Sequence, residues 1–162
     1  MLILIAGLPG TGKTTIARAL SAMIGAIHLN SDVLRSQLGL MGQYTAEAKQ
    51  QVYDALLDSA GVALAAGKTV IVDSTFYQKS IRQPFEHLAK VCGVPLHWVE
   101  IQASERTLEE RLGKPRPDSE ADYSVYEKIR DLFEPLPEAR LVINSDKETP
   151  ESAAKLIQQY CP

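Results

Sequence analysis

The clearest chemical pattern in the sequence is the segment from Gly7 to Thr14, which reads GLPGTGKT and fits G-x-x-x-x-G-K-[ST]. Glycines at these positions let the backbone approach a phosphate closely and direct successive N–H groups at it. We predict that Lys13 binds the β- and γ-phosphates of ATP and that the Thr14 hydroxyl binds Mg²⁺. The residues predicted to contact the nucleotide are Gly7, Pro9, Gly10, Thr11, Gly12, Lys13, Thr14 and Thr15.

The flanking sequence supports this interpretation. Residues 2–6 form a continuous apolar run, typical of a strand buried on both faces. Residues 14–24 follow a helical spacing, so the loop leads into a helix N-terminus that favours an anion. A glycine-rich turn that arose by chance would not be expected to lie between a buried strand and a helix. The spacing also differs from the GxGxxG pattern of dinucleotide-binding proteins, in which Lys-Thr has no role.

Asp32 and Arg35 form a second candidate group. Asp32 follows a predicted strand at 26–29, and ligands of open parallel sheets gather at the carboxyl ends of strands. A carboxylate there can accept the proton of an attacking hydroxyl group. Arg35 lies one helical turn later, where it would bind an anionic acceptor or keep Asp32 ionised. The alternative is a helix-capping aspartate in a surface ion pair. Because the phosphate loop is present in the same sequence, we favour the catalytic interpretation of Asp32.

Asp73 follows a third apolar run at 69–72. An acidic residue after a buried strand is suited to hold Mg²⁺ through its water shell, and we predict that Asp73 contributes to the metal site together with Thr14. The alternative is an Asx-turn that merely starts a loop. Arg82, on the next predicted helix, faces the acceptor in one interpretation and the solvent in the other.

A polar loop at about 113–120, containing two prolines, is expected to act as a lid. Arginines close to it can stabilise a transferring phosphoryl group, and a closing loop excludes water. We select Arg111 first and Arg116 second for this role. Arg106 lies among glutamates, which fits an ordinary solvated helix face.

Five short apolar runs alternate with helical patterns, which predicts a three-layer α/β/α domain with a five-stranded parallel sheet. A single domain over residues 1–162 fits the length. The helices are expected at 14–24, 31–38 with Ser31 as cap, 45–66, 78–92, 104–112, 121–133 and from Pro150 onward, and the remaining strands at 96–101 and 141–144. Pro84 suggests a later start, near Gln83, for the helix over 78–92.

The amino-acid composition limits the classes of partner that we expect the protein to bind. The net charge is −3, without the basic excess typical of proteins that bind long nucleic acids. The two cysteines have no metal-binding spacing. No stretch approaches the ~18 apolar residues of a membrane span, so we expect a cytoplasmic protein without membrane contact.

Several segments together resemble the polynucleotide-kinase-like branch of small P-loop kinases, the AAA-type ATP-binding proteins with zeta-toxin-like and chloramphenicol-phosphotransferase-like relatives. The resemblance implies a sheet order of 2-3-1-4-5, Asp32 as general base, Arg35 as a contact of the acceptor, and Arg111 and Arg116 in the lid. The matching segments are GLPGTGKTT at 7–15, NSDVLR at 30–35, GKTVIVDSTF at 67–76, EERL at 109–112, SEADYSVYEK at 119–128 and FEPL at 133–136.

These observations predict a kinase that transfers the γ-phosphate of Mg-ATP to a hydroxyl group. The acidic pI of 5.6 and the small size favour a small-molecule acceptor, such as a nucleoside, sugar or antibiotic. A 5′-hydroxyl of a nucleic acid remains an alternative acceptor. A non-catalytic ATP-dependent switch is the alternative from another class, although it would not need Asp32 and Arg35. The sequence leaves the oligomeric state open.

Overall fold

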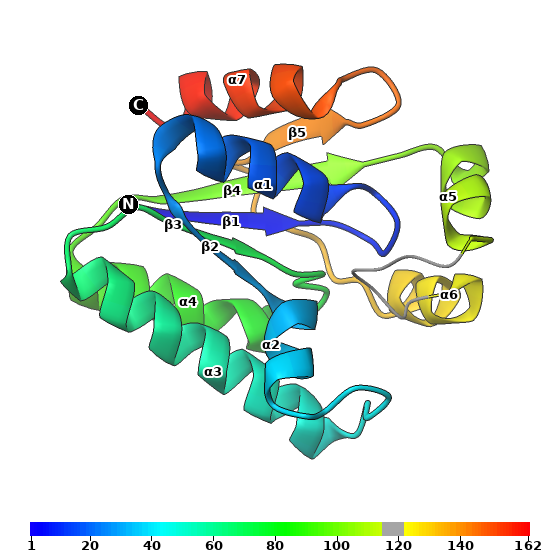
Figure 1. Ribbon diagram of the computed structural model, residues 1–162, viewed down its shortest axis with the longest axis horizontal. Helices are drawn as coiled ribbons and strands as arrows, with labels where there is room; N and C mark the ends of the chain where they lie inside the picture. Colours follow the sequence, from blue (N-terminus) through cyan, green and yellow to red (C-terminus); the bar gives the residue numbers. More distant parts are fainter. Residues whose placement is uncertain (115–121) are drawn as a thin grey trace.

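A computed structural model describes residues 1–114 and 122–162. Its five strands form one parallel sheet in the order β2-β3-β1-β4-β5, which confirms the predicted topology. The strands are β1 (Leu2–Ala6), β2 (Ile27–Asn30), β3 (Val70–Asp73), β4 (Leu96–Gln102) and β5 (Leu141–Asn144). All of them point the same way, so their carboxyl ends meet at one edge of the sheet (Figure 1).

Helices cover both faces of the sheet (Figure 1). On one face lie α1 (Lys13–Ile24) and α7 (Pro150–Tyr160), and on the other α3 (Ala46–Ala65) and α4 (Lys79–Cys92). Three shorter helices lie toward the carboxyl ends of the strands: α2 (Ser31–Gln37), α5 (Glu105–Leu112) and α6 (Tyr123–Asp131). No helix within the described residues is both long enough and apolar enough to cross a membrane.

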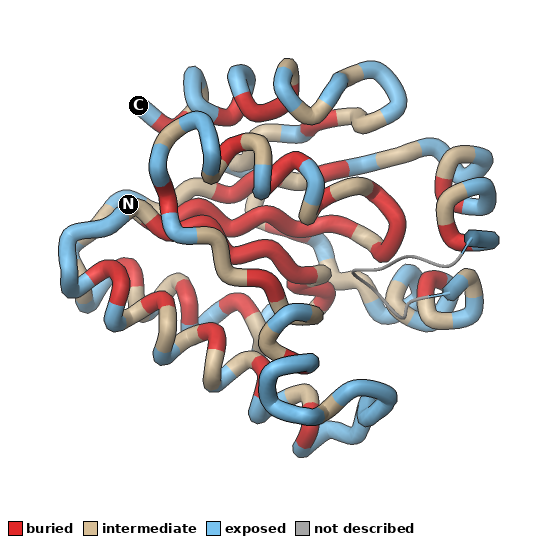
Figure 2. Tube along the Cα trace, in the orientation of Figure 1, coloured by how far each residue is buried: buried red, intermediate tan, exposed pale blue. Residues whose placement is uncertain are grey.

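The central strand β1 explains the continuous apolar run at the start of the sequence. Successive side chains of a strand point to opposite faces. Accordingly, Leu2 and Leu4 join the core beneath α3 and α4, and Ile3 and Ile5 join the core beneath α1 and α7. All residues of β1 are fully buried, as Figure 2 shows along the centre of the sheet.

Two local expectations are wrong. Helix α4 begins at Lys79 with Pro84 inside it, so the helix over 78–92 is confirmed and the later start near Gln83 is wrong. The cap of α2 is Asn30, whose side-chain oxygen accepts a hydrogen bond from the Val33 N–H, and Ser31 is already helical.

Arg82 explains how α4 starts before its proline. The side chain is only 2% exposed, so it neither faces the solvent nor lines the acceptor side. Its guanidinium donates hydrogen bonds to the carbonyl oxygens of Phe76, Glu134 and Pro135 at 2.5–2.6 Å. The first turns of α4 are thereby tied to the loop after β3 and to the segment after α6.

Replacing Arg82 with methionine is expected to destabilise the fold, because three carbonyl oxygens lose a buried hydrogen-bond donor. We expect the free energy of unfolding to fall by about 3 kcal/mol, measured by urea denaturation. The matched control is Arg106→Ala, since the Arg106 side chain is 88% exposed. This change should cost less than about 0.5 kcal/mol. Equal midpoints for the two variants would contradict the structural role of Arg82.

Candidate functional site

The segment Gly7 to Thr14 connects β1 to α1 and curls around a single carbonyl group. The carbonyl oxygen of Leu8 accepts hydrogen bonds from Lys13 Nζ and Thr11 Oγ1, both at 2.9 Å. Gly12 has φ +92°, in the left-handed region that favours glycine. At Gly7 a Cβ atom would lie 2.4 Å from the Ile101 carbonyl oxygen, so no other residue fits this close approach.

Beside this loop, Asp73 gathers polar groups from three elements. Its Oδ1 accepts hydrogen bonds from Thr14 Oγ1 at 3.1 Å and from Asn30 Nδ2 at 2.9 Å. Its Oδ2 lies 2.5 Å from Nε2 of His28. The sheet register brings these groups together, because Asn30 and His28 lie on β2, where Asn30 is directly paired with Asp73 at the end of β3.

The Thr14 hydroxyl and the Asp73 carboxylate suit Mg²⁺. Both are hard oxygen ligands, and Mg²⁺ is usually bound by one or two such protein groups together with phosphates and waters. Among the described residues no cluster of three or more His, Cys, Asp and Glu side chains is arranged to hold a metal. This donor set therefore fits a metal that is bound together with a nucleotide better than a metal held by protein side chains alone.

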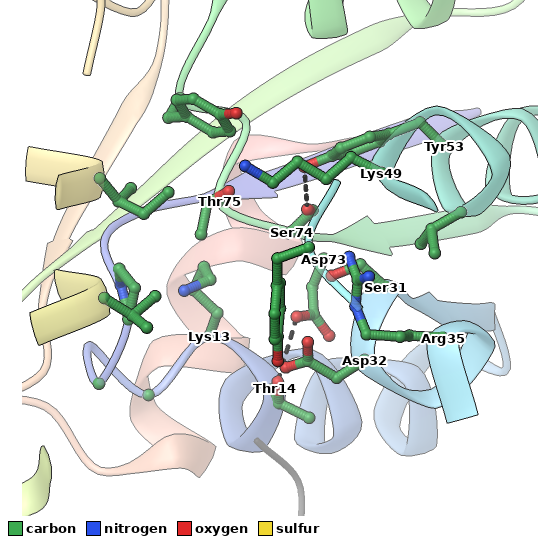
Figure 3. A pocket seen from close by; sticks show the side chains of 18 of the residues that line it. Lys13, Thr14, Ser31, Asp32, Arg35, Lys49, Tyr53, Asp73, Ser74 and Thr75 are labelled. Atoms are coloured by element: carbon green, nitrogen blue, oxygen red, sulfur yellow. Dashed lines mark hydrogen bonds between the residues drawn. The ribbon is translucent and has the colours of Figure 1, made fainter. Parts of the chain in front are cut away.

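Next to the phosphate loop lies a cavity of about 280 Å³ that Asp32 also lines. Asp32 is in the first turn of α2, directly after the cap at Asn30. Figure 3 places its carboxylate beside Asp73 and Thr14, on the opposite side of the view from Lys49 and Thr75. The site residues predicted to line this cavity, and found there, are Pro9, Gly10, Gly12, Lys13, Thr14, Thr15, Asp32, Arg35 and Asp73.

Arg35 also lines the cavity. Its Nη1 donates a hydrogen bond to the Gln43 carbonyl oxygen at 2.6 Å, and its guanidinium lies over the Tyr44 ring at 4.7 Å. Within the described residues, no carboxylate forms an ion pair with it.

Arg111 contacts the phosphate loop from outside this cavity. Its Nη1 donates hydrogen bonds to the Gly10 carbonyl oxygen at 3.2 Å and to Ser145 Oγ at 3.0 Å. The C-terminal end of α5 is thus attached to the loop and to the turn after β5. Arg116, and the predicted lid from residue 115 onward, lie outside the described residues.

The strand order, together with the phosphate loop at the carboxyl end of the central strand, defines a P-loop kinase-like fold. Residues 2–136 match the AAA domain family (AAA_33), and the chain belongs to that family.

Solved structures agree with this fold. A sugar kinase from Janibacter has a TM-score of 0.77 at 16% identity, and the match covers 99% of this chain and 93% of that one. Kti12 from Chaetomium thermophilum, in complex with ADP-AlF3, has a TM-score of 0.75 at 22% identity over 98% of both chains. The APS kinase CysC of Mycobacterium tuberculosis, in complex with AMPPNP and APS, has a TM-score of 0.71 at 17% identity, covering 99% and 97%. At these identities the likeness concerns the fold.

A curated relative is more similar in sequence but much longer. An uncharacterized protein of Mycobacterium tuberculosis is 32% identical over an alignment of 100 residues, and the match covers 54% of this chain and 20% of that protein. The matched region is therefore about a fifth of the relative's length.

Sequence reasoning missed several residues of the site. His28 has no metal-binding spacing in the sequence, yet it contacts Asp73. Asn30 was passed over because Ser31 was chosen as the cap. The helix pattern over 45–66 identified the buried stripe of α3 but not its polar residues Lys49 and Tyr53, which line the cavity. The position of Asn30 at the end of a strand, three residues before Val33, was the available signal.

Two substitutions of Asn30 should separate its two functions. Asn30→Ala removes both the cap and the amide donor to Asp73, and should lower the free energy of unfolding by about 1 kcal/mol. Asn30→Ser retains a capping oxygen and should remain close to wild type in urea denaturation. Both variants should bind Mg-ATP about tenfold more weakly by calorimetry, because Asp73 loses a positioning donor. Full Mg-ATP affinity in Asn30→Ser would contradict this role.

Proposed function

We propose that this protein is a kinase that transfers the γ-phosphate of Mg-ATP to a hydroxyl group of a small molecule. The observation that carries the proposal is that Asp32, Lys13 and Thr14 line one cavity. A potential proton acceptor thus lies within the same space as the groups suited to phosphate and metal. A neighbouring fold in complex with AMPPNP, and another with ADP-AlF3, support nucleotide binding at this loop.

In the proposed reaction each residue has a defined task. Lys13 leaves the Leu8 carbonyl and donates to the β- and γ-phosphate oxygens, and the loop N–H groups hold the phosphate chain. Mg²⁺, when bound, neutralises charge that develops on the phosphates. Asp32 orients the acceptor hydroxyl and takes its proton while the acceptor oxygen bonds to the γ-phosphorus and ADP departs. Catalysis then rests on positioning and electrostatics rather than on a covalent intermediate.

A small-molecule acceptor is favoured by the size of the cavity, about 280 Å³, which is close to the lower end for small-ligand sites. The side chains of Val125 and Ile129 on α6 contribute to its lining, so α6 helps to bound the site. A nucleic-acid 5′-hydroxyl is the second acceptor considered, and labelled ATP with 5′-hydroxyl oligonucleotides tests it directly. A non-catalytic switch is less well supported, because it leaves Asp32 in the cavity without a task.

The central prediction concerns Asp32. Asp32→Asn should retain Mg-ATP binding, measured by calorimetry, and reduce phosphate transfer by a factor of 10² or more, because the amide cannot accept the acceptor's proton. Transfer is followed with γ-labelled ATP across nucleosides, sugars, antibiotics and oligonucleotides. Lys13→Ala serves as the comparison and should lose nucleotide binding itself. Unaltered turnover in Asp32→Asn would remove Asp32 from the mechanism.

Arg111 provides a test of the lid. If its guanidinium moves from the Gly10 carbonyl to the transferring phosphate, Arg111→Ala lowers kcat by about 10² or more with little change in KM for ATP. The control is Arg106→Ala on the same helix, which should behave as wild type. A raised KM with unchanged kcat would instead make Arg111 a support of the phosphate loop, and Arg116 would then take the lid role.

A further inference from the structure

The part of the cavity away from the phosphate loop contains two cations that the proposed reaction leaves unexplained. Arg35 comes from α2, and Lys49 comes from α3. Lys49 belongs to a set that also includes Val52 and Tyr53, three and four residues later, so all three lie on one side of α3 and line the cavity. Figure 3 shows Lys49 and Arg35 among the side chains of its wall.

Lys49 has no anionic partner in the part of the chain that the structure describes. The residue is half-buried, and its ammonium group lies 5.8 Å from the centre of the Tyr77 ring. None of the ion pairs found in this part of the chain includes it. A lysine normally keeps its ammonium group in water or next to a carboxylate. A half-buried ammonium that lines a cavity and forms none of these ion pairs is suited to a negatively charged ligand, although Asp32 and Asp73 line the same cavity.

Arg35 gives an independent indication of the same chemistry. The residue is 7% exposed, and its Nε–H has no hydrogen-bond partner among the described residues. Buried donors are nearly always paired, and leaving one without an acceptor costs free energy. Its contacts with the Gln43 carbonyl and the Tyr44 ring hold the guanidinium in place without neutralising its charge.

Neutral hydroxyl groups complete this part of the wall. Tyr53 Oη and Ser74 Oγ lie 2.8 Å apart and share one hydrogen bond. Burial raises the pKa of Tyr53, although its hydrogen bonds to Ser74 and Thr75 act in the opposite direction. The phenol therefore stays neutral at physiological pH and adds no negative charge next to Lys49.

We propose that the acceptor of the phosphate is an alcohol that carries an oxyanion group, either a carboxylate or a phosphate monoester, which Lys49 and Arg35 hold while Asp32 faces its hydroxyl. The inference rests on the proposed kinase function and narrows its substrate class. Charge-assisted hydrogen bonds from these cations supply the affinity, and the neutral hydroxyls supply further contacts. Cationic acceptors, such as aminoglycosides, are disfavoured by the same two charges.

The first experiment compares acceptors that differ mainly in the anionic group. The pairs are gluconate and sorbitol for a carboxylate, and glucose 6-phosphate and glucose, or a nucleoside 5′-monophosphate and its nucleoside, for a phosphate. Kanamycin represents the cationic class. ADP release and ³¹P NMR of the product measure transfer. In at least one pair, kcat/KM should be at least tenfold higher for the anionic member, and the advantage should shrink at high salt.

Variants then assign the preference to the two cations. Lys49→Gln and Arg35→Gln should each lower kcat/KM for the preferred anion by about 10- to 100-fold, mainly through KM, and should lower it far less for the neutral partner, so that the preference for the anion shrinks. Lys155→Gln, on the exposed side of α7, is the matched control and should equal wild type. Because Arg35 is buried and its variant is at risk of misfolding, Lys49→Gln carries the test if Arg35→Gln unfolds.

A binding experiment separates this inference from the kinase proposal. Protein saturated with Mg-ADP, so that the phosphate loop is filled, is titrated calorimetrically with gluconate, glucose 6-phosphate and the nucleoside monophosphate. Binding that Lys49→Gln weakens supports the anion site, and if no acceptor is then phosphorylated, only the kinase proposal fails. If the enzyme prefers neutral or cationic acceptors, the anion site is overturned and the kinase proposal stands. The same conclusion follows if both variants keep the wild-type preference for the anionic acceptor. Neither binding nor transfer would overturn both.

Discussion

One buried carboxyl group organises the edge of the sheet that carries the phosphate loop. Asp73 is 1% exposed, and a polar group so deeply buried needs hydrogen-bond partners that offset its desolvation. It obtains them from Thr14 on α1 and from Asn30 and His28 on β2. The first helix, the edge strand and β3 are therefore held together at the point where the phosphate loop begins. The geometry of the loop and the placement of α2 both depend on this cluster, because Asn30 is also the cap of that helix.

The layered fold was predictable because it depends on patterns within single segments. Five apolar runs separated by helices lead to a parallel sheet with both faces covered, and the glycine-rich loop identifies the central strand by its chemistry. The strand order needed the resemblance to a family, since apolar runs alone do not say which strand lies beside which. Element ends were less certain, as Pro84 illustrates. The local rule against proline in a helix was overridden by Arg82, whose three carbonyl partners hold the preceding turn.

The candidate site was predictable only where a short sequence pattern carries its own chemistry. Lys13 and Thr14 belong to such a pattern, and Asp32 and Asp73 are recognisable because they follow strands. Lys49 and Tyr53 have no such signal, because a polar residue on a long amphipathic helix has the same sequence pattern whether it faces water or a cavity. Only the packing of α3 beside β3 decides between them. Arg82 was misjudged for the related reason that a buried arginine and a ligand-binding arginine have the same local sequence.

The arrangement divides the site into two parts with different structural origins. The nucleotide part comes from the β1–α1 connection and the ends of β2 and β3, where close backbone approach at Gly7 leaves no room for another residue. The acceptor part comes from α2 and α3, which form the connection between the neighbouring strands β2 and β3. Among the hydrogen bonds and ring contacts of the described residues, none joins Lys49 to Lys13 or to Asp73. A side chain such as Lys49 can therefore change without disturbing the phosphate loop. In the proposed kinase, acceptor choice is therefore a property of the charge and shape of α2 and α3, and the two cations there favour anions.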